Sequence, residues 1–153
     1  MKKIKLNKTN IGDIKYLLDE SESEFVKSRN DNGDLDDLLK RFVKNNKLKL
    51  FKLQIDLETV GFVSLFHSNI KDTVAIGPMY ISKKFRCKGY GRLQIVELIK
   101  YCRDKNYKEI KTKTWGKNIA SKKIFDSLGF ELYEEVKNNR VDGDSTVKYK
   151  ICL

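Results

Sequence analysis

Apolar and polar residues follow two different periods along this chain, and the change of period divides it. Near the amino end, the alternating segment 3–6 predicts a short strand, and Asn10 can cap a helix over 11–20. A second helix is expected over 34–45, where apolar residues recur at the helical spacing. The polar segment 21–32 between these helices gives no prediction. From residue 48 the period falls to two, which indicates strands.

Three strands are predicted in succession, over 48–55, 60–66 and 73–82, with a hairpin loop over 56–59. A helix then begins at the glycine pair Gly89 and Gly91 and runs to about Asp104. On this helix, the residues expected to be buried are Ile95, Leu98, Ile99 and Cys102, and those expected to face water are Gln94, Glu97, Lys100 and Asp104.

The carboxyl-terminal third alternates strand and helix. A strand is predicted over 109–115, a helix from the Asn118 cap to Leu128, and two strands over 130–136 and 146–152. Gly129 is expected to end the helix in the left-handed conformation. The whole order favours an α/β or α+β fold with one sheet of about seven strands.

The composition favours one globular domain over 1–153. The chain is 40% hydrophobic and 35% charged, and it has no low-complexity linker. No apolar run approaches the ~20 residues of a membrane span, and the first lysines are not followed by the apolar core of a secretion signal. The cysteines Cys87, Cys102 and Cys152 match no disulfide or metal-binding pattern. We therefore expect no metal site, no membrane partner and a cytoplasmic location.

The formal net charge of +11 predicts a surface that attracts anions, such as nucleic acids or phosphorylated cofactors. The lysines are spread along the whole chain, which favours an ordinary solvated surface over a dedicated patch. Trp115 ends an apolar strand, where packing is a better explanation than stacking on bases. No RNA-binding signature or helix-turn-helix spacing is present, so nucleic acid is not an expected partner.

The loop from Arg86 to Gly91 lies between a predicted strand and a predicted helix. Its two glycines leave the backbone uncovered, and the helix N-terminus carries about half a positive charge. Such a turn can bind phosphate oxygens, but taken alone it can equally be an ordinary strand-to-helix turn with solvated lysines. The loop has neither the lysine of a P-loop nor the third glycine of a dinucleotide fingerprint, because position 94 is Gln94.

Two blocks of the sequence together resemble the GNAT superfamily of acyl-CoA-dependent N-acyltransferases. The run from Met79 to Gly91 is similar to the family's acetyl-CoA motif, and the block from Asn118 to Phe130 is similar to its second motif. The resemblance covers about residues 73–136 and implies acetyl-CoA as co-substrate. By resemblance, the residues that would contact it are Met79, Tyr80, Ile81, Arg86, Cys87, Lys88, Gly89, Tyr90, Gly91, Arg92, Asn118, Ser121 and Phe125.

The chain departs from the family pattern at two positions of the loop. Lys83 stands where the family usually has proline, and Cys87 stands at the first loop glycine. Neither change removes the backbone of the Gly89–Gly91 turn, although Cys87 is expected to restrict the first turn of the loop.

Pro78 predicts an irregularity in the third of the successive strands, because proline cannot donate to a sheet ladder. The family resemblance gives this irregularity a meaning. It implies a mixed, mostly antiparallel sheet that is splayed between its fourth and fifth strands. It also implies that the N–H near Ile81 polarises the thioester carbonyl.

The catalytic proton donor is open at this stage. Many family members place a tyrosine in the last helix, where this chain has Phe125. Tyr80, Tyr133 and Ser82 are the candidate donors. The candidate bases are Glu20, Glu22, Glu24, Asp72 and His67, each of which can equally be an ordinary surface residue.

The sequence thus predicts N-acetylation of a primary amine, carried by a small molecule or a peptide, through direct attack on the thioester. The alternative is a CoA-binding module without transferase activity, because Phe125 cannot donate a proton. The last strand, which ends at Leu153, could pair with a second copy in a homodimer.

Overall fold

The computed structural model describes residues 1–26 and 35–153 of the chain. Part of the segment 21–32, for which the pattern gives no prediction, lies outside the described residues. The elements in chain order are β1 (Ile4–Thr9), a 3-10 turn (Gly12–Ile14), α1 (Lys15–Val26), α2 (Leu35–Lys44), β2 (Leu48–Ile55), β3 (Glu58–His67), β4 (Thr73–Ile81), a 3-10 turn (Lys83–Phe85), α3 (Tyr90–Asp104), β5 (Glu109–Trp115), α4 (Ile119–Ser127), β6 (Glu131–Val136) and β7 (Thr146–Cys152).

The strands form a single seven-stranded sheet in the order β1-β2-β3-β4-β5-β7-β6. All neighbouring strands are antiparallel except β4 and β5, which are parallel. The predicted mixed, mostly antiparallel sheet is confirmed. The last strand, β7, pairs with β5 and β6 on its two sides, so it is an interior strand and the predicted pairing of this strand with a second copy is wrong.

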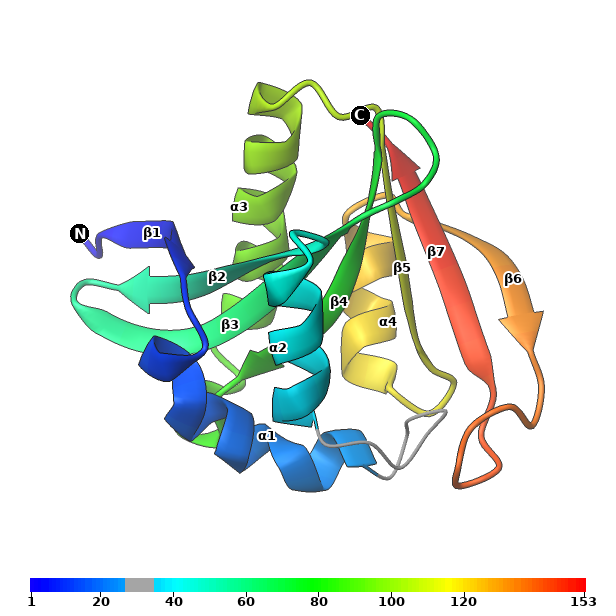
Figure 1. The fold of residues 1–153 in the computed structure, drawn as a ribbon, viewed down its shortest axis with the longest axis horizontal. Coiled ribbons are helices and arrows are strands. Elements are labelled where there is room, and N and C mark those ends of the chain that lie inside the picture. Colours follow the sequence, from blue (N-terminus) through cyan, green and yellow to red (C-terminus); the bar gives the residue numbers. More distant parts are fainter. Residues whose placement is uncertain (27–34) are drawn as a thin grey trace.

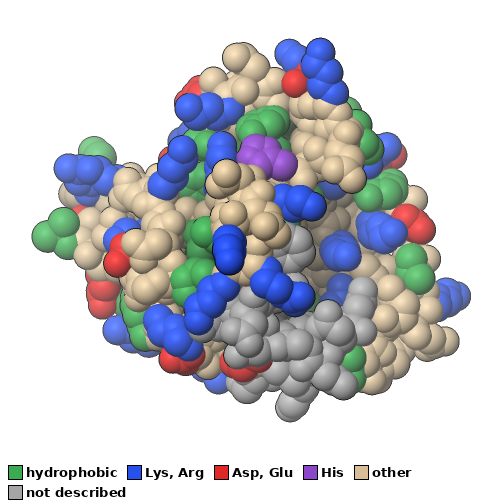
Figure 2. Space-filling model, viewed as in Figure 1, with side chains coloured by type: hydrophobic (Ala, Val, Ile, Leu, Met, Phe, Trp, Pro, Cys, Tyr) green, Lys and Arg blue, Asp and Glu red, His purple; other side chains and the backbone are tan. Residues whose placement is uncertain are grey.

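Helices cover both faces of the sheet (Figure 1). On one face, the first 3-10 turn, α1 and α2 bury Ile14, Leu17 and Leu39 against β2 and β3. On the other face, α3 and α4 share a core with the inner side of β5 and β7. Burying these apolar side chains from water supplies the main stabilisation of both layers. Figure 2 shows the face that carries α1 and α2, with lysine and arginine side chains over much of it.

The fourth strand contains the irregularity that Pro78 predicts. Between β3 and β4, Val63 pairs with Met79 and Leu65 pairs with Ile76, so β4 has one extra residue opposite Ser64. The Ser64 hydroxyl donates to the Pro78 carbonyl at 2.8 Å. At Gly77, a Cβ would lie 1.9 Å from a ring carbon of Phe66, so only glycine fits this bulge.

The bulge coincides with the end of pairing between β4 and β5. These strands pair over only four rungs, the last of which joins Ile76 to Thr112. Beyond it, β4 continues to Ile81 and β5 continues to Trp115 without pairing to each other. The predicted splay between the fourth and fifth strands is therefore confirmed.

The first helix extends beyond its predicted end. Asn10 caps a 3-10 turn, since its Oδ1 accepts from the Asp13 N–H at 2.9 Å, and α1 then runs to Val26. The polar residues after Glu20 hide this extension from a reading of apolar periodicity. Tertiary contacts hold the helix instead, as Glu20 and Glu24 both reach residues after β4.

The helix after the glycine loop is confirmed, with one error in its buried face. Ile95, Leu98, Ile99 and Cys102 are buried as predicted, but Gln94 is also fully buried instead of facing water. Its Nε2 donates to the Phe62 carbonyl at 3.0 Å. The error arises because Gln94 is a polar residue type, although it lies four residues before the buried Leu98 and therefore on the face that packs against β3.

Candidate cofactor and acceptor site

The turn between β4 and α3 contains two residues in the left-handed region of backbone conformation, with Lys88 between them. Cys87 has φ +60° and Gly89 has φ +79°. A non-glycine residue in this region costs about 1–2 kcal/mol, so the expected restriction at Cys87 is present as backbone strain. Gly89 is open: a Cβ there would meet no atom within 4 Å. Space therefore lies directly over the start of α3.

The first turn of α3 presents backbone donors to this space. The first helical hydrogen bond is donated by the Leu93 N–H to the Gly89 carbonyl at 3.1 Å. The N–H groups of Tyr90, Gly91 and Arg92 precede it, and no side chain caps the helix. Together with the positive end of the helix dipole, these groups suit a pyrophosphate.

The end of β4 directs backbone groups into the splay. The Ser82 N–H donates to the Val60 carbonyl at 2.9 Å, so Ser82 and Tyr80 turn their backbone groups toward β3. Backbone directions alternate along an antiparallel strand, which turns those of Met79 and Ile81 toward the unpaired side. Consistent with this, the Ile81 carbonyl accepts from Arg86 Nε at 3.0 Å.

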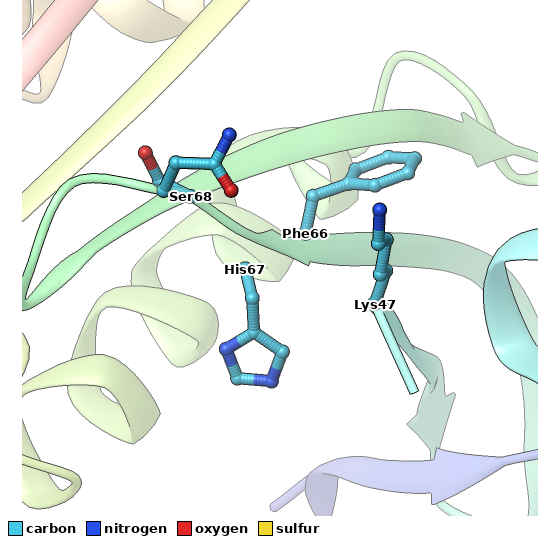
Figure 3. A pocket seen from close by; sticks show the side chains of 5 residues that line it. Lys47, Phe66, His67 and Ser68 are labelled. Atoms are coloured by element: carbon cyan, nitrogen blue, oxygen red, sulfur yellow. The ribbon is translucent and has the colours of Figure 1, made fainter. Parts of the chain in front are cut away.

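The pocket around His67 lies far from this turn. It has a volume of about 370 Å³ and is lined by Lys47, Phe66, His67, Ser68 and Asn69 (Figure 3). His67 pairs with Val74, whereas Ile81 lies seven residues further along β4, or about 20 Å at ~3.3 Å per residue. Asp72 lies at the same distant end. The structure thus does not bring His67 or Asp72 to the loop.

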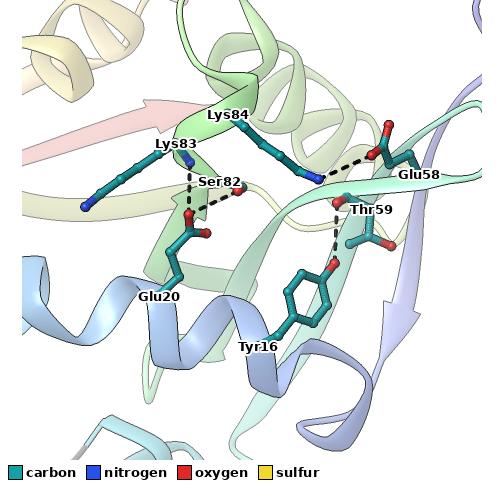
Figure 4. Close-up of polar contacts among 7 residues, drawn as sticks. All are labelled: Tyr16, Glu20, Glu58, Thr59, Ser82, Lys83 and Lys84. Carbon is teal, nitrogen blue, oxygen red and sulfur yellow. Dashed lines mark hydrogen bonds and ion pairs between the residues drawn. The ribbon is translucent and has the colours of Figure 1, made fainter.

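Two carboxylates of α1 face the residues that follow β4. Glu20 accepts from the Ser82 hydroxyl at 3.2 Å and from the Lys83 N–H at 3.4 Å (Figure 4). Glu24 forms a two-pronged ion pair with Arg86, with N···O distances of 3.0 and 3.1 Å. Of the candidate bases, Glu20 and Glu24 are therefore brought to the site, and both already have partners there.

Tyr80 is buried between these acids and the sheet. Its ring lies 5.0 Å from the Arg86 guanidinium carbon, and its side chain packs in the core under α1. Burial, followed by the negative charges of Glu24 and Glu20, raises the pKa of Tyr80. The phenol is therefore protonated at neutral pH. Tyr133 lies elsewhere, on β6, where its ring is 5.8 Å from the Lys111 ammonium and 5.4 Å from that of Lys150.

The Asn118 block organises the start of α4. Asn118 Oδ1 accepts from the Ser121 N–H at 3.3 Å, which confirms the predicted cap. Its Nδ2 donates to Thr114 Oγ1 and Ser121 Oγ. Phe125 is 1% exposed and packs against Phe130 and Tyr149, with ring centroids 5.2 and 5.4 Å away. Its role in this structure is core packing, and contact with a cofactor stays a prediction.

Sequence reasoning missed two features of this region. It did not pair Glu24 with Arg86, because α1 was expected to end before Glu24. It also treated the lysines as evenly spread, whereas four of them meet on β5 and β7. The signal for the second was the alternation Lys111-Thr112-Lys113 and Lys148-Tyr149-Lys150, which places each pair on one face of a strand.

Among the described residues, no group of three or more His, Cys, Asp or Glu side chains is arranged to hold a metal ion. In the same part of the chain, no helix has the length and apolar character needed to cross a membrane.

Several solved structures share this fold at low sequence identity. An N-acetyltransferase from Staphylococcus aureus aligns with a TM-score of 0.80 at 14% identity, covering 98% of both chains. A spermidine N-acetyltransferase from Vibrio cholerae, solved with CoA and spermine, aligns at 0.82 and 15%, covering 97% of this chain and 95% of that one. A ribosomal-protein-alanine N-acetyltransferase from Brucella melitensis aligns at 0.80 and 15%, covering 97% and 99%.

No curated protein sequence matches this chain. The model of the acetyltransferase (GNAT) family matches residues 14–130, which include the splay, the glycine turn and the Asn118 block. The chain therefore belongs to the acetyltransferase (GNAT) family, whose enzymes are N-acetyltransferases that use acetyl-CoA.

Proposed function

We propose that residues 1–153 act as one catalytic domain that transfers the acetyl group of acetyl-CoA directly to a primary amine. The observation that carries this proposal is the splay of β4 from β5, with the backbone groups of Met79 and Ile81 turned into it beside the start of α3. This arrangement suits a long, anionic thioester whose pyrophosphate rests on the helix and whose acyl end lies in the splay.

The residues that would bind acetyl-CoA line the splay and the start of α3. The turn of Arg86, Cys87, Lys88, Gly89, Tyr90, Gly91 and Arg92 would hold the pyrophosphate. The backbone of Met79, Tyr80 and Ile81 would line the pantetheine arm, and Asn118, Ser121 and Phe125 would border it from α4. The assignment of the turn residues is argued from their charge and exposed N–H donors. The assignments on β4 and α4 are argued from their position beside the splay.

In the transfer step, the nitrogen lone pair forms a bond to the thioester carbon and the carbon–sulfur bond breaks. The amine loses one proton, and the departing CoA thiolate gains one. An N–H of β4 aimed at the thioester oxygen would stabilise the charge that develops there. A lysine-like amine has a pKa of about 10.4, so at pH 7 its neutral form costs roughly 4.6 kcal/mol. A base on the acceptor side would lower that cost.

Tyr80 is better placed as proton donor than Tyr133. It lies on the strand that borders the splay, and its raised pKa keeps it protonated at neutral pH. Tyr133 lies on β6, beyond β7. For the base we favour Glu20, whose carboxylate already accepts from Ser82 at the end of β4. A polarised water between Glu20 and the amine would connect them.

The acceptor is a primary amine on a small molecule or on a peptide. Both classes have precedent in the fold, in the spermidine N-acetyltransferase and the ribosomal-protein-alanine N-acetyltransferase. The three cysteines match no disulfide pattern, which predicts a cytoplasmic location, and we therefore propose that the substrates are cytoplasmic.

Free-CoA release with a panel of polyamines and peptides tests this function. We expect acetyl-CoA-dependent release with at least one amine class and, for Tyr80→Phe, a fall in kcat of about 10²-fold, the effect of losing a general acid. Tyr133→Phe is the matched control and should have less effect. Acetyl-CoA binding by calorimetry without CoA release from any amine would favour the CoA-binding module instead.

A further inference from the structure

The outer face of the β5–β7–β6 part of the sheet carries a cluster of lysines. Ile110, Val147 and Tyr149 point into the core that α3 and α4 cover. Side chains alternate between the two faces of a strand, so the neighbouring lysines of β5 and β7 lie on the opposite face. We call Lys111, Lys113, Lys148 and Lys150 the lysine quartet.

The quartet consists of two pairs of like charges placed directly opposite each other. Lys111 pairs with Lys150, and Lys113 pairs with Lys148, across the β5–β7 ladder. Opposite Cβ atoms in such a ladder are about 5 Å apart, and like charges there destabilise the sheet. On the other side of β7, Glu131 lies opposite Lys150 and Glu134 lies opposite Lys148, so the like-charge pairs are confined to the β5–β7 ladder.

Two of the four lysines have a carboxylate partner within ion-pair distance. Lys148 pairs with Glu134 at 2.9 Å and Lys111 approaches Glu109 at 3.8 Å. Among the residues that the structure describes, no carboxylate lies within ion-pair distance of Lys113 or Lys150. Partial burial, followed by the charges of Arg140 and Lys148, lowers the pKa of Lys113. An anion beside Lys113 would raise that pKa again.

The quartet borders the splay on the face that carries α1. Lys113 comes directly after Thr112, the last residue of β5 that pairs with β4. Figure 2 shows lysine and arginine side chains over the β5–β7 part of this face. Across the splay, the negative charge of Glu24 is balanced by Arg86, whereas Glu20 keeps its charge and accepts from the Ser82 hydroxyl and the Lys83 N–H. The β5–β7 side of the splay is therefore more positive than the α1 side.

We propose that the lysine quartet binds acidic side chains of a polypeptide acceptor and so selects acidic peptides over polyamines. This inference rests on the proposed function. Residues two apart on an extended strand are about 7 Å apart, which is the spacing from Lys111 to Lys113 along β5. An extended segment with acidic residues at alternate positions would match this spacing and present its terminal amine toward the splay.

A set of three peptides tests the selection. Each begins with a free alanine amine and has glutamate, glutamine or arginine at its second and fourth positions, so that the terminal amine is the primary amine in every peptide. We expect kcat/KM to be highest for the acidic peptide and lowest for the basic one. The acidic peptide should exceed the neutral one about fivefold to tenfold, as expected for two exposed ion pairs.

The matched variants separate a specific surface from total charge. Lys113→Gln with Lys148→Gln should reduce the ratio of acidic to neutral kcat/KM to about one, and Lys5→Gln with Lys71→Gln, on other parts of the surface, should leave it unchanged. Thermal unfolding checks that each double variant is folded. A preference for the neutral or basic peptide, a ratio that survives in the quartet variant, or an equal loss in the control variant would each overturn the proposal.

Binding without turnover keeps the two hypotheses apart. Fluorescence anisotropy of a labelled acidic peptide, with free CoA present, reports the quartet even if no acetyl group is transferred. Quartet-dependent binding without CoA release would retain this inference and reject the transferase. CoA release without quartet-dependent binding would do the reverse. Equal competition by single-stranded DNA of the same charge at physiological salt would show that the face recognises charge alone, and would also overturn the proposal.

Discussion

The glycine turn at the start of α3 and the lysine quartet on β5 and β7 are both positive, but they are built from different parts of the chain. The turn uses backbone N–H groups and the helix dipole, supplied by consecutive residues from Arg86 to Arg92. The quartet uses side chains that two strands bring together. A site of the first kind depends on local conformation, whereas one of the second depends on sheet register and on individual charges.

The largest effect should come from blocking the turn itself. For Gly91→Glu we expect acetyl-CoA affinity to fall about 100-fold or more, because its Cβ would lie 3.0 Å from Ile124 Cδ1 and its carboxylate would repel the pyrophosphate. Calorimetry measures the affinity. Gly91→Ala is the control for bulk without charge and should lose far less, whereas an unaltered affinity in Gly91→Glu would mean that the pyrophosphate lies elsewhere.

Alkylation of the cysteines can test cofactor binding at the glycine turn and on β7 in one experiment. Cys87 lies in the turn and Cys152 lies at the end of β7, and both are exposed. Burial raises the pKa of Cys102 to about 12, so this thiol stays protonated and unreactive at pH 8. At ten times its Kd, acetyl-CoA should slow the alkylation of Cys87 about tenfold by mass action, with no change at Cys152. Mass spectrometry of labelled peptides distinguishes the three sites, and equal protection of Cys87 and Cys152 would contradict the separation of the two regions.

The ion pair between Glu24 and Arg86 connects the turn to α1. In Glu24→Gln, Arg86 loses its carboxylate partner and becomes available to the phosphates, so acetyl-CoA affinity should rise about twofold to threefold, as expected for an exposed ion pair. Calorimetry at low and high salt measures the change, which salt should reduce. Asp19→Asn removes an acid of the same helix that pairs with Lys15 and should leave the affinity as it is. A weaker affinity in Glu24→Gln would indicate that Glu24 positions Arg86 for the cofactor.

The smallest effect concerns the strain in the turn. Cys87→Gly relieves a left-handed residue but adds freedom to the unfolded chain, so the free energy of unfolding should rise by only about 0.5 kcal/mol. Denaturant unfolding measures this change. Cys152→Gly, on a strand, should instead destabilise the protein. A clear loss of stability in Cys87→Gly would show that the thiol makes contacts that outweigh the backbone strain.

The fold was largely predictable because its signals are local. The bulge at Pro78, the left-handed stop at Gly129 (φ +84°) and the cap at Asn118 each follow from the conformational limits of one residue type. The turn was predictable for the same reason. The burial of Gln94 was not, since it depends on a tertiary hydrogen bond to the Phe62 carbonyl of β3.

The contacts of α1 and of the lysine quartet were less predictable because they join residues far apart in sequence. Neither the reach of Glu24 to Arg86 nor the register that sets Lys113 opposite Lys148 is visible in periodicity. The distance of His67 from the glycine turn likewise became evident only from the pairing of β3 with β4.

The short contact between β4 and β5 also has a mechanical consequence. Four rungs are the whole of the ladder that joins the β1–β4 part of the sheet to the β5–β7–β6 part. This ladder should be the most easily deformed part of the sheet. Small rotations of the two parts about it would widen or narrow the splay, while the strand pairing within each part stays intact. Amide exchange in the native protein should accordingly be faster along this ladder than within the β2–β3 hairpin, and a donor that bridges the two parts should slow it.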